Sequence, residues 1–569
     1  MPLVPLVIAL QLQTASLAPT PAARLAAIEA ADSARDARRA RDAQASFERA
    51  RRSNLPWEGG SGGRCEVRLG RYCWWYDETA PPLPPENEAT TRRRAELIAQ
   101  LDTLAELHPG DDWLAGMRVH YRVDARRTDA ADTVARGCRS TRWWCDALLG
   151  YAAHVRGDAA LADSAFAAAL AGMDEATRCQ WTDIHTLLPS DSRERYEELP
   201  CADRAPMERR YWLLGWPRLA APANEWRNEF FTRRVQAWLA ERSRTPHNLS
   251  WGKDAEELLL RYGWPNVWGR VEQTGGTYAA GEPSVIGHDP SPSFAFAPQE
   301  ALLDSLASGG DDGWDLRSRY GESRFAPIHV RRIAPISAQL ARFRRGDSVL
   351  VVAAYATADD SLAHPISRLA AALDDQHTVV GPPDSLRVGT TALRLPSAPR
   401  LVGIEVTDTT TGTLARRRML FRPDTGGVRV ALSDLLLYRP GAEPAPVLDS
   451  ALARAIPGDT VSRDRPLGIF WETYGLAEGG ESVDVAVTVE RIDRSWFRSA
   501  RQRLGLGDQD TPLRIRWTDA RSAASGVAPH AVSLDLGNLP GGRYRLTLTL
   551  TPDGAPAVAS TGEIELREP

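Results

Sequence analysis

The chain has 569 residues, a net charge of −5, 43% hydrophobic residues and 25% charged residues. Its length predicts three or four domains with ordinary buried cores. A charge balance this close to neutral excludes a global field that would attract nucleic acid or an anionic membrane surface. No run of about 18 or more apolar residues occurs, so the sequence predicts no membrane span.

The first 18 residues resemble a secretory signal. Met1 to Ala18 holds a short apolar run, followed by small residues that end Ala15-Ser16-Leu17-Ala18. The run lacks the preceding Lys or Arg that such signals usually carry, and no cysteine follows at which a lipid anchor would attach. We expect residues 1–18 to be a signal peptide and the protein to be periplasmic or secreted.

The six cysteines all lie in the first third of the chain and come in close pairs: Cys65 and Cys73, Cys138 and Cys145, Cys179 and Cys201. An even number placed in this way predicts disulfides formed in an oxidising compartment. Proximity favours sequential pairing, although the connectivity stays open. Buried reduced thiols are the alternative, and a zinc site is disfavoured because no CxxC and no neighbouring histidine pair is present.

Residues 19–90 are expected to form a helical segment, a glycine-rich linker and a small hairpin. From Pro21 to Arg52 the apolar residues recur at helical spacing, which predicts a helix or a helix pair. Residues 59–63 spell the G-x-S-x-G of a nucleophile elbow, but a loop with proline precedes them where an elbow needs a buried strand. We interpret them as a flexible link. Alternation around Gly70 predicts a hairpin closed by the first cysteine pair.

Residues 91–250 are predicted to form an α-helical array. Trp113 and Trp144 each open a helix-turn-helix stretch. In the second stretch Gly150, a Gly157-Asp158 turn and Phe166 resemble the tetratricopeptide repeat pattern, in which small residues let two helices cross closely and an aromatic ring fills the space between them. An ordinary helical hairpin is the alternative. The pair Cys138–Cys145 would staple the connection between two units, and residues 224–242 predict a further amphipathic helix.

Residues 251–325 are expected to be a tryptophan-rich junction followed by loops. Aromatic and charged side chains gather there, and we call this set the tryptophan junction: Trp251, Lys253, Asp254, Arg261, Tyr262, Trp264 and Trp268. Ligands often bind in grooves between domains, so the set is a candidate binding site. The alternative is interdomain packing, with Lys253 paired to Asp254 or Glu257.

The remaining chain predicts two antiparallel β-sandwich domains of immunoglobulin-like kind, at residues 326–445 and 460–569. Short apolar runs bounded by turns recur, such as residues 348–353, 401–406, 468–472 and 542–550. Their alternation is typical of half-buried antiparallel strands. The predicted fold class is therefore multidomain α plus β, with a helical repeat-like array followed by two sandwiches.

Three motifs in this order resemble the GWxTD-domain proteins of bacteria. They are Arg261-Tyr262-Gly263-Trp264-Pro265, Ser433-Asp434-Leu435-Leu436-Leu437, and Phe470-Trp471-Glu472-Thr473-Tyr474-Gly475-Leu476. The resemblance covers about residues 200–569, and Pro265-Asn266 stands where the name-giving motif continues with Thr-Asp. It implies an exported protein of unassigned molecular function, often with helical repeats, and no catalytic residues to carry over.

The sequence predicts no catalytic residue, no metal site and no cofactor. The ten histidines are scattered without the spacing that places two imidazoles on one metal. Phosphate-binding glycine loops are absent from the sequence, and residues 309–313 form only a fragment of a calcium loop. Acidic pairs such as Asp111-Asp112 favour helix capping over acid–base work.

Three functions compete on these grounds. The leading hypothesis is a non-enzymatic exported scaffold of the cell envelope that binds a protein or peptide, with no nucleic-acid partner. The alternative is an extracytoplasmic hydrolase or glycan-binding protein that uses the tryptophan junction, which would need an open cleft with at least two facing carboxylates. A structural envelope component with only assembly contacts is the third.

Overall fold

The computed structural model describes residues 21–57, 66–74, 85–270, 285–289, 293–297, 300, 303, 316, 321–358, 362–396, 401–420, 429–476, 481–492, 512–521, 526–554 and 556–568. The expected signal peptide, the glycine-rich link at residues 59–63, Cys65 and the calcium-loop fragment at residues 309–313 lie outside these ranges.

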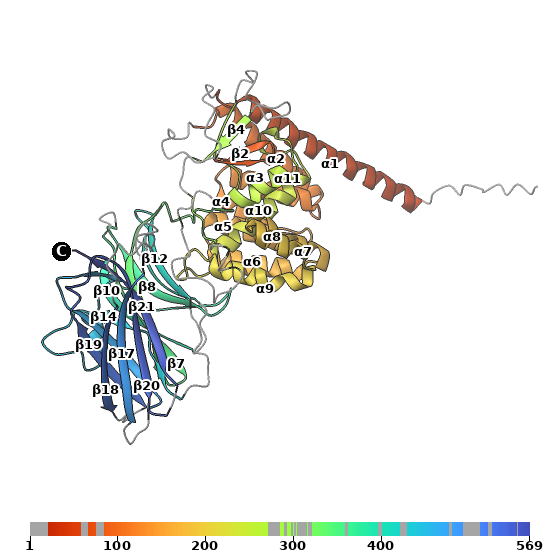
Figure 1. The fold of residues 1–569 in the computed structure, drawn as a ribbon. Coiled ribbons are helices and arrows are strands. Elements are labelled where there is room, and N and C mark those ends of the chain that lie inside the picture. Colours follow the sequence, from red (N-terminus) through yellow and green to blue (C-terminus); the bar gives the residue numbers. More distant parts are fainter. Residues whose placement is uncertain are drawn as a thin grey trace, which may run out of the picture.

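Helices make up the first part of the chain, and strands follow (Figure 1). The fold is therefore mixed α plus β, in the predicted order. The helical region consists of α1 (Pro21–Ser53), α2 (Glu88–Leu107), α3 (Asp112–Asp124), α4 (Thr128–Arg136), α5 (Arg142–Arg156), α6 (Ala159–Gly172), α7 (Glu175–Thr182), η1 (His185–Leu187), α8 (Ser190–Glu197), α9 (Cys201–Leu214), α10 (Glu225–Glu241), η2 (Pro246–Asn248) and α11 (Lys253–Tyr262).

The hairpin of α5 and α6 has the local features that the sequence predicts. Gly157 ends α5 with a φ of 89°, a left-handed conformation that glycine adopts without steric cost. Asp158 then caps α6 by accepting a hydrogen bond from the backbone N–H of Leu161. A Cβ atom at Gly150 would lie 2.8 Å from the ring of Phe166, so the missing side chain is what lets the two helices cross closely.

The amphipathic helix predicted at residues 224–242 is α10. Asn224 caps it by accepting hydrogen bonds from the backbone N–H groups of Trp226 and Arg227. Its predicted apolar face is buried in the main core of the helical region at Trp226, Phe230, Val235 and Leu239.

Two of the three predicted disulfides are present among the described residues. Cys138 is bonded to Cys145, and Cys179 is bonded to Cys201. Cys73 is also disulfide-bonded, while its predicted partner Cys65 lies outside the described residues. The first bond joins the end of α4 to α5, where the sequence places a staple between two helical hairpins.

A small second core lies at one end of the helical region. The predicted hairpin is formed by β1 (Val67–Leu69) and β2 (Tyr72–Trp74) around Gly70, whose φ is 53°. It packs against α11 and against a second hairpin of β3 (Val267–Arg270) and β4 (Val285–His288). Segments far apart in sequence therefore share this core.

The first β unit has two sheets. One has the strand order β10-β7-β6 and the other the order β5-β12-β11-β8-β9. The strands are β5 (Arg332–Ile333), β6 (Ser337–Arg345), β7 (Ser348–Ala356), β8 (Ile366–Ala372), β9 (Thr378–Val380), β10 (Val388–Pro396), β11 (Leu401–Asp408) and β12 (Thr413–Leu420). One apolar core joins side chains of β7 and β10 to side chains of β8, β11 and β12, so the two sheets face each other.

The second β unit is built in the same way. In one sheet β16 pairs with β13, β14 and β19, and the other sheet has the order β15-β21-β20-β17-β18. Its elements are β13 (Ala431–Leu432), β14 (Leu436–Tyr438), α13 (Leu448–Leu452), β15 (Thr460–Ser462), β16 (Leu467–Tyr474), β17 (Glu481–Arg491), β18 (Leu513–Arg521), β19 (Val527–Leu534), β20 (Gly542–Pro552) and β21 (Val558–Arg567). The predicted limit of residue 445 is too late for the first unit, because β13 and β14 pair with β16.

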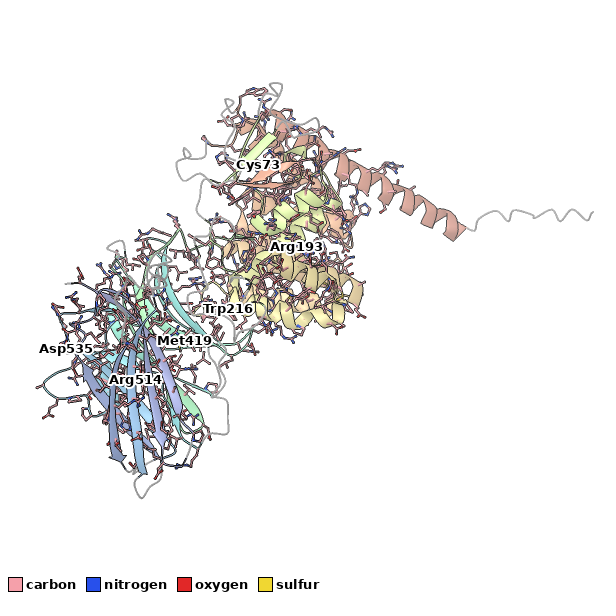
Figure 2. All side chains as sticks on the ribbon, in the orientation of Figure 1. Cys73, Arg193, Trp216, Met419, Arg514 and Asp535 are labelled. Carbon is pink, nitrogen blue, oxygen red and sulfur yellow. A yellow bond between two sulfur atoms is a disulfide. The ribbon has the colours of Figure 1, made fainter. Side chains whose placement is uncertain are left out.

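The layers of the molecule are stacked face to face. The sheet that contains β11 and β12 has one face on its own unit's core and the other on the helical region, through Leu401, Leu414 and Leu420. Figure 2 shows Trp216 and Met419 on the two sides of this border. A further apolar cluster joins β6 and β7 to β14, β16 and α13, so the two β units are also in contact.

This stacking corrects the expectation of half-buried strands. β16 is buried at each of its positions, and β11 at all but Thr407. Both faces of these central strands are covered, which favours continuous apolar runs over strict alternation. Edge strand β10 keeps the alternating pattern over much of its length.

Among the residues that the structure describes, no helix combines the length and the apolar character needed to cross a bilayer.

Candidate functional site

The tryptophan junction surrounds α11 and is tied to the first hairpin by an ion pair. Asp254 accepts hydrogen bonds from Arg71 at Nε and Nη2, both at 2.7 Å, and from the Arg71 backbone N–H. These bonds lower the pKa of the Asp254 carboxyl. The expected pairing of Lys253 is wrong: Lys253 is exposed and forms no ion pair among the described residues. Arg71, brought in by the hairpin, takes the place that Lys253 was expected to fill.

Arg261 and Tyr262 close the helix end. Arg261 bonds Glu257 at 2.9 Å, Glu322 at 2.6 Å and the Tyr262 hydroxyl at 3.0 Å. The ring of Tyr262 stacks on Trp74 with centroids 4.5 Å apart. Gly263 then ends α11 with a φ of 81°. The first motif of the family resemblance thus has a packing role in this chain.

The three remaining tryptophans are half-buried against the same small core. Centroids of Trp251 and Trp264 are 6.3 Å apart, as are those of Trp264 and Trp268. The indole N–H of Trp268 donates to the carbonyl oxygen of Pro265 at 2.7 Å. The nearby carboxylates Asp254 and Glu257 are engaged by arginines. The junction is therefore built chiefly by packing, and part of each tryptophan surface stays open to solvent.

A cavity of about 290 Å³ lies elsewhere in the helical region, at the turn between α2 and α3. We call it the array cavity. Its wall is more polar than apolar, and five titratable side chains stand among small and apolar residues: Ala105, Glu106, His108, Pro109, Asp111, Ala115, Arg118, Val134, Gly137, Cys138 and Arg139. In concave sites of this kind, polar groups fix the orientation of a bound ligand or peptide.

Some charges of the array cavity are paired and others are not. Arg118 is held by Asp102 at 2.7 Å, and His108 by Asp36 of α1 at 3.0 Å. Glu106 and Arg139 are exposed at the cavity and form no ion pair with any residue that the structure describes. Beside them Leu107 is 64% exposed. Asp111 is a second lining carboxylate without an ion pair among the described residues, and it caps α3 by accepting from the backbone N–H of Leu114. We call Glu106, Arg139 and Leu107 the rim; Leu107 follows Glu106 in the chain but does not itself line the cavity.

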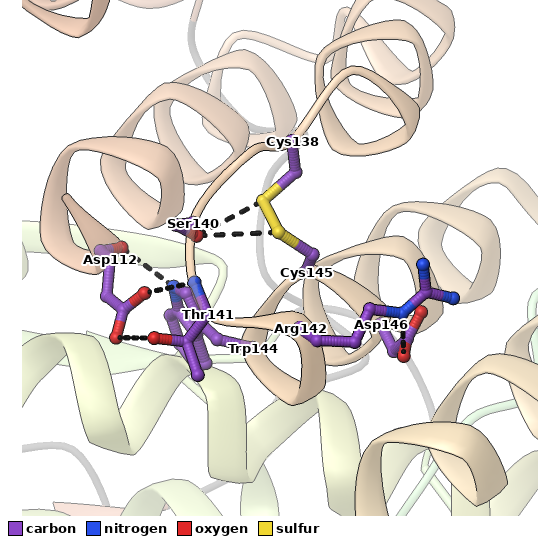
Figure 3. Close-up of a disulfide and its surroundings, with 8 residues drawn as sticks. All are labelled: Asp112, Cys138, Ser140, Thr141, Arg142, Trp144, Cys145 and Asp146. Atoms are coloured by element: carbon purple, nitrogen blue, oxygen red, sulfur yellow. Dashed lines mark hydrogen bonds and ion pairs between the residues drawn. A yellow bond between two sulfur atoms is a disulfide. The ribbon is translucent and has the colours of Figure 1, made fainter. Parts of the chain in front are cut away.

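A covalent and hydrogen-bonded frame supports this wall (Figure 3). The Ser140 hydroxyl lies 3.2 Å and 3.4 Å from the two sulfur atoms of Cys138–Cys145. Asp112, at the start of α3, accepts from the backbone N–H and the hydroxyl of Thr141, both at 2.9 Å. Its carbonyl oxygen accepts from the indole N–H of Trp144 at 2.7 Å. The starts of α3 and α5 are thereby fixed to each other.

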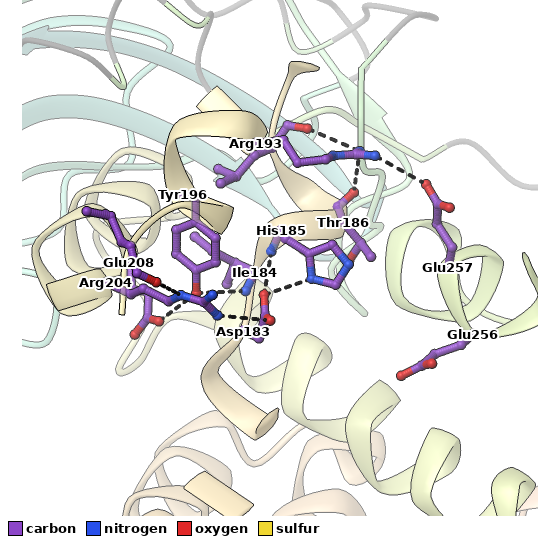
Figure 4. Close-up of polar contacts among 12 residues, drawn as sticks. Asp183, Ile184, His185, Thr186, Arg193, Tyr196, Arg204, Glu208, Glu256 and Glu257 are labelled. Carbon is purple, nitrogen blue, oxygen red and sulfur yellow. Dashed lines mark hydrogen bonds and ion pairs between the residues drawn. The ribbon is translucent and has the colours of Figure 1, made fainter. Parts of the chain in front are cut away.

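The polar cluster around Asp183 is a second site, one that sequence reasoning did not find (Figure 4). Asp183 accepts from the backbone N–H of His185 at 2.9 Å and lies 2.8 Å from its Nδ1. Although burial opposes it, the bonds from His185 lower the pKa of Asp183. Arg204 adds a contact at 3.2 Å. The Cys179–Cys201 bond brackets this segment, and the close cysteine spacing was the only sequence signal for it.

An aspartate that orients an imidazole is one half of a proton-transfer site. Burial raises the pKa of neighbouring Glu208, which accepts from the Tyr196 hydroxyl at 2.8 Å. Among the described residues, however, His185 is bonded to Asp183 alone, and no hydroxyl or thiol nucleophile is bonded to its ring. Within the part of the chain that the structure describes, the cluster therefore lacks the nucleophile of a hydrolytic triad.

A third polar cluster is buried where α1 meets α3 and η2. Glu48 accepts from the Tyr121 hydroxyl and from the backbone N–H of His247, each at 2.8 Å. Burial raises the pKa of Glu48 to about 7, against the opposing effect of Arg51. His247 has a φ of 58°, and both of its ring nitrogens are buried without a hydrogen-bond partner among the described residues. This cluster links segments about 200 residues apart, which no local pattern reveals.

Metal-ligating groups do not gather at any of these places. Within the described ranges, no three His, Cys, Asp or Glu side chains are arranged to hold a metal ion.

No family model matches this chain, and no curated protein matches it. Among solved structures, the chain is similar to a transglutaminase of red sea bream, with 11% identity, a TM-score of 0.14 and coverage of 41% of this chain and 31% of that one. It is similar to an alpha-2-macroglobulin of Salmonella reacted with methylamine, with 9% identity, a TM-score of 0.20 and coverage of 41% and 24%. A 1.5-MDa bacterial ice-binding adhesin gives 10% identity, a TM-score of 0.13 and coverage of 42% and 66%. The chain thus spans a third or less of the first two proteins, and scores this low support no functional statement.

Proposed function

We propose that this protein is exported and acts as a non-enzymatic scaffold of the cell envelope, with the array cavity as the docking point for a protein or peptide. In this proposal the helical region is a tetratricopeptide-like array, the two β units are immunoglobulin-like sandwiches, and residues 1–18 direct export. The family relation to GWxTD-domain proteins remains part of the proposal, supported by motif order alone.

One observation carries the proposal. The array cavity combines a concave wall, a disulfide-fixed frame and a rim where Glu106, Arg139 and Leu107 have charge or apolar surface to offer. A peptide that bears both charges and an apolar side chain would satisfy all three. A fixed wall lowers the ordering cost of such binding, because less conformational freedom is lost.

Site-specific photo-crosslinking in cells tests this proposal. A crosslinking amino acid replaces Leu107 at the cavity rim, and in a matched control it replaces Val447 of the second β unit, which is 51% exposed. We expect a discrete adduct from position 107 that Arg139→Glu abolishes, and none from position 447. Equal labelling from both positions, or an adduct that survives the charge reversal, would contradict docking at the cavity.

Glycan binding at the tryptophan junction is the second candidate. It is favoured by the half-buried state of Trp251, Trp264 and Trp268, because exposed ring faces can stack on sugars. Tryptophan fluorescence titrated with envelope glycans, in the unaltered protein and in Trp264→Ala, tests it. A saturable change that Trp264→Ala removes would favour this function over the scaffold.

A further inference from the structure

Two arginines at the border between the helical region and the first β unit, Arg418 buried and Arg416 half-buried, share one carbonyl oxygen. Arg416 donates through Nη1 to the carbonyl oxygens of Trp216 and Pro217, at 2.9 Å and 2.6 Å. Arg418 donates through Nη2 to the same Pro217 oxygen at 3.1 Å. The two guanidinium groups therefore lie close together, and like charges at this separation repel each other.

A single carboxylate faces this pair of arginines. Glu405 lies 3.3 Å from Arg418 and is itself 1% exposed. Its two oxygens also accept from the backbone N–H groups of Leu219 and Ala220, at 2.7 Å and 3.0 Å. Neighbouring Arg218 is neutralised by its own partner, Glu225. Among the residues that the structure describes, the charges at this border therefore sum to one uncompensated positive charge.

The hydrogen-bonding groups left over here are all donors. Nε and Nη1 of Arg418 and Nη2 of Arg416 are buried and have no hydrogen-bond partner among the residues that the structure describes. Arg418 is 3% exposed, while Arg416 is half-buried and lies over the ring of Phe296. Unsatisfied buried donors of a charged group are costly, so a native structure normally supplies their partner.

A water molecule fits this environment less well than an anion. Water could accept from the arginines, but its own two hydrogens would then need acceptors. The Glu405 carboxylate already accepts three hydrogen bonds, so it has room for only about one more, at Oε2. An anion accepts hydrogen bonds only, and it also supplies the missing negative charge. Burial and the adjacent Arg418 lower the pKa of Arg416, which is the effect expected of an arginine that lacks a counter-charge.

We propose that one small inorganic anion of halide size binds between Arg416 and Arg418 and joins the helical region to the first β unit. The near-complete burial of Arg418 limits the ion to a small one. Glu405 and the anion would then together neutralise the positive charges of Arg416 and Arg418.

Bromide and chloride are suitable probes for this site in the full-length protein. Crystals soaked in bromide should show an anomalous peak within hydrogen-bonding distance of both guanidinium groups. In solution, the melting temperature should rise and saturate with sodium chloride, but not with sodium gluconate at equal ionic strength, because gluconate is too large to enter.

Three variants separate this site from general salt effects. Arg416→Met should weaken the apparent chloride affinity about tenfold or more, because a charge-assisted contact is lost. Arg417→Met changes the next residue, on the opposite face of β12, and should leave the affinity unchanged. Glu405→Gln removes the competing negative charge and should tighten chloride binding.

Several results would overturn the proposed anion site. A bromide soak with no anomalous peak, or a peak away from both arginines, overturns the proposal without any variant. So does a chloride dependence that gluconate reproduces, or one that Arg416→Met leaves intact.

Discussion

In the helical region, charged side chains are buried among the helices, as with Glu48, Arg94 and Arg233. In the β units, the buried ion pairs lie at borders between layers, as with Glu405 and Arg418. The difference has a physical cause. A sheet satisfies its backbone internally and offers flat apolar faces, whereas each helix leaves unpaired carbonyl groups at its end. Arg233 donates to one such carbonyl, that of Leu260 in the last turn of α11, and to the carbonyl of Arg324 in a loop.

The two regions should therefore respond to different perturbations. Changes of redox state should act on the part of the chain before the β units, which has all six cysteines, and Glu48 makes the helical region sensitive to pH near neutrality. Substitutions at the border between the helical region and the first β unit should lower the stability of both regions together.

The largest effect is expected at the border itself. Glu405→Ala leaves the buried guanidinium group of Arg418 without its carboxylate and frees the N–H groups of Leu219 and Ala220. The free energy of unfolding should fall by about 3–5 kcal/mol, measured by urea denaturation. Glu563→Ala removes an exposed ion pair in the second β unit and should cost less than about 1 kcal/mol. Equal losses in the two variants would show that the border charges are not coupled to the fold.

The next effect is a pH dependence located in the helical region. The pKa of Glu48 is raised from 4.5 to about 7 in the folded protein, so between these values the folded state binds more protons than the unfolded state. Stability should therefore fall as the pH rises through this window, by about 3 kcal/mol in total.

Glu48→Gln should flatten that dependence, as measured by unfolding at pH 5 and pH 8. The control is Glu88→Gln, which changes an exposed residue at the start of α2. A pH profile that Glu48→Gln leaves unaltered would place the titrating group elsewhere.

Removal of the Cys138–Cys145 bond should have a smaller effect. The bond closes a loop with a sequence separation of 7, and its loss in Cys138→Ala/Cys145→Ala should cost about 2–3 kcal/mol. Hydrogen exchange should speed up in α4 and α5 and stay unchanged in β17 and β20. Faster exchange in the β units would contradict the separation of the two regions.

The smallest effect is expected for the ion pair between the two β units. Arg342 and Asp434 are joined at 2.6 Å, but their side chains are 25% and 24% exposed. A double-mutant cycle with Arg342→Ala and Asp434→Ala should give a coupling energy of about 1 kcal/mol or less. A much larger coupling would show that this junction depends on charge as strongly as the helical border does.

Local patterns in the sequence predicted much of the fold. Gly157 and Asp158 act through neighbours a few residues away, Gly150 and Phe166 meet within one helical hairpin, and that hairpin has the predicted form. Sequential spacing also identified both described disulfides. The order of helices before strands follows from the same periodicities.

Contacts between distant segments escaped prediction. Glu48 meets His247, Asp254 meets Arg71, and Glu405 meets Leu219, each across more than 180 residues. The residues next to a charged residue in the sequence do not identify a partner more than 180 residues away. The full burial of β16 was missed for a related reason: its second covering layer comes from β6 and β7 of the other unit.

The bond between Glu405 and the backbone of Leu219 and Ala220 also bears on the order in which the chain is made. Leu219 leaves the ribosome well before Glu405 does. The surface of the nascent helical region around Leu219 therefore stays exposed to solvent during this part of synthesis. A chaperone that covers this surface until strand β11 emerges would protect the nascent chain from aggregation. Truncated products that end before residue 405 should therefore be recovered with chaperones more often than products that extend past residue 420.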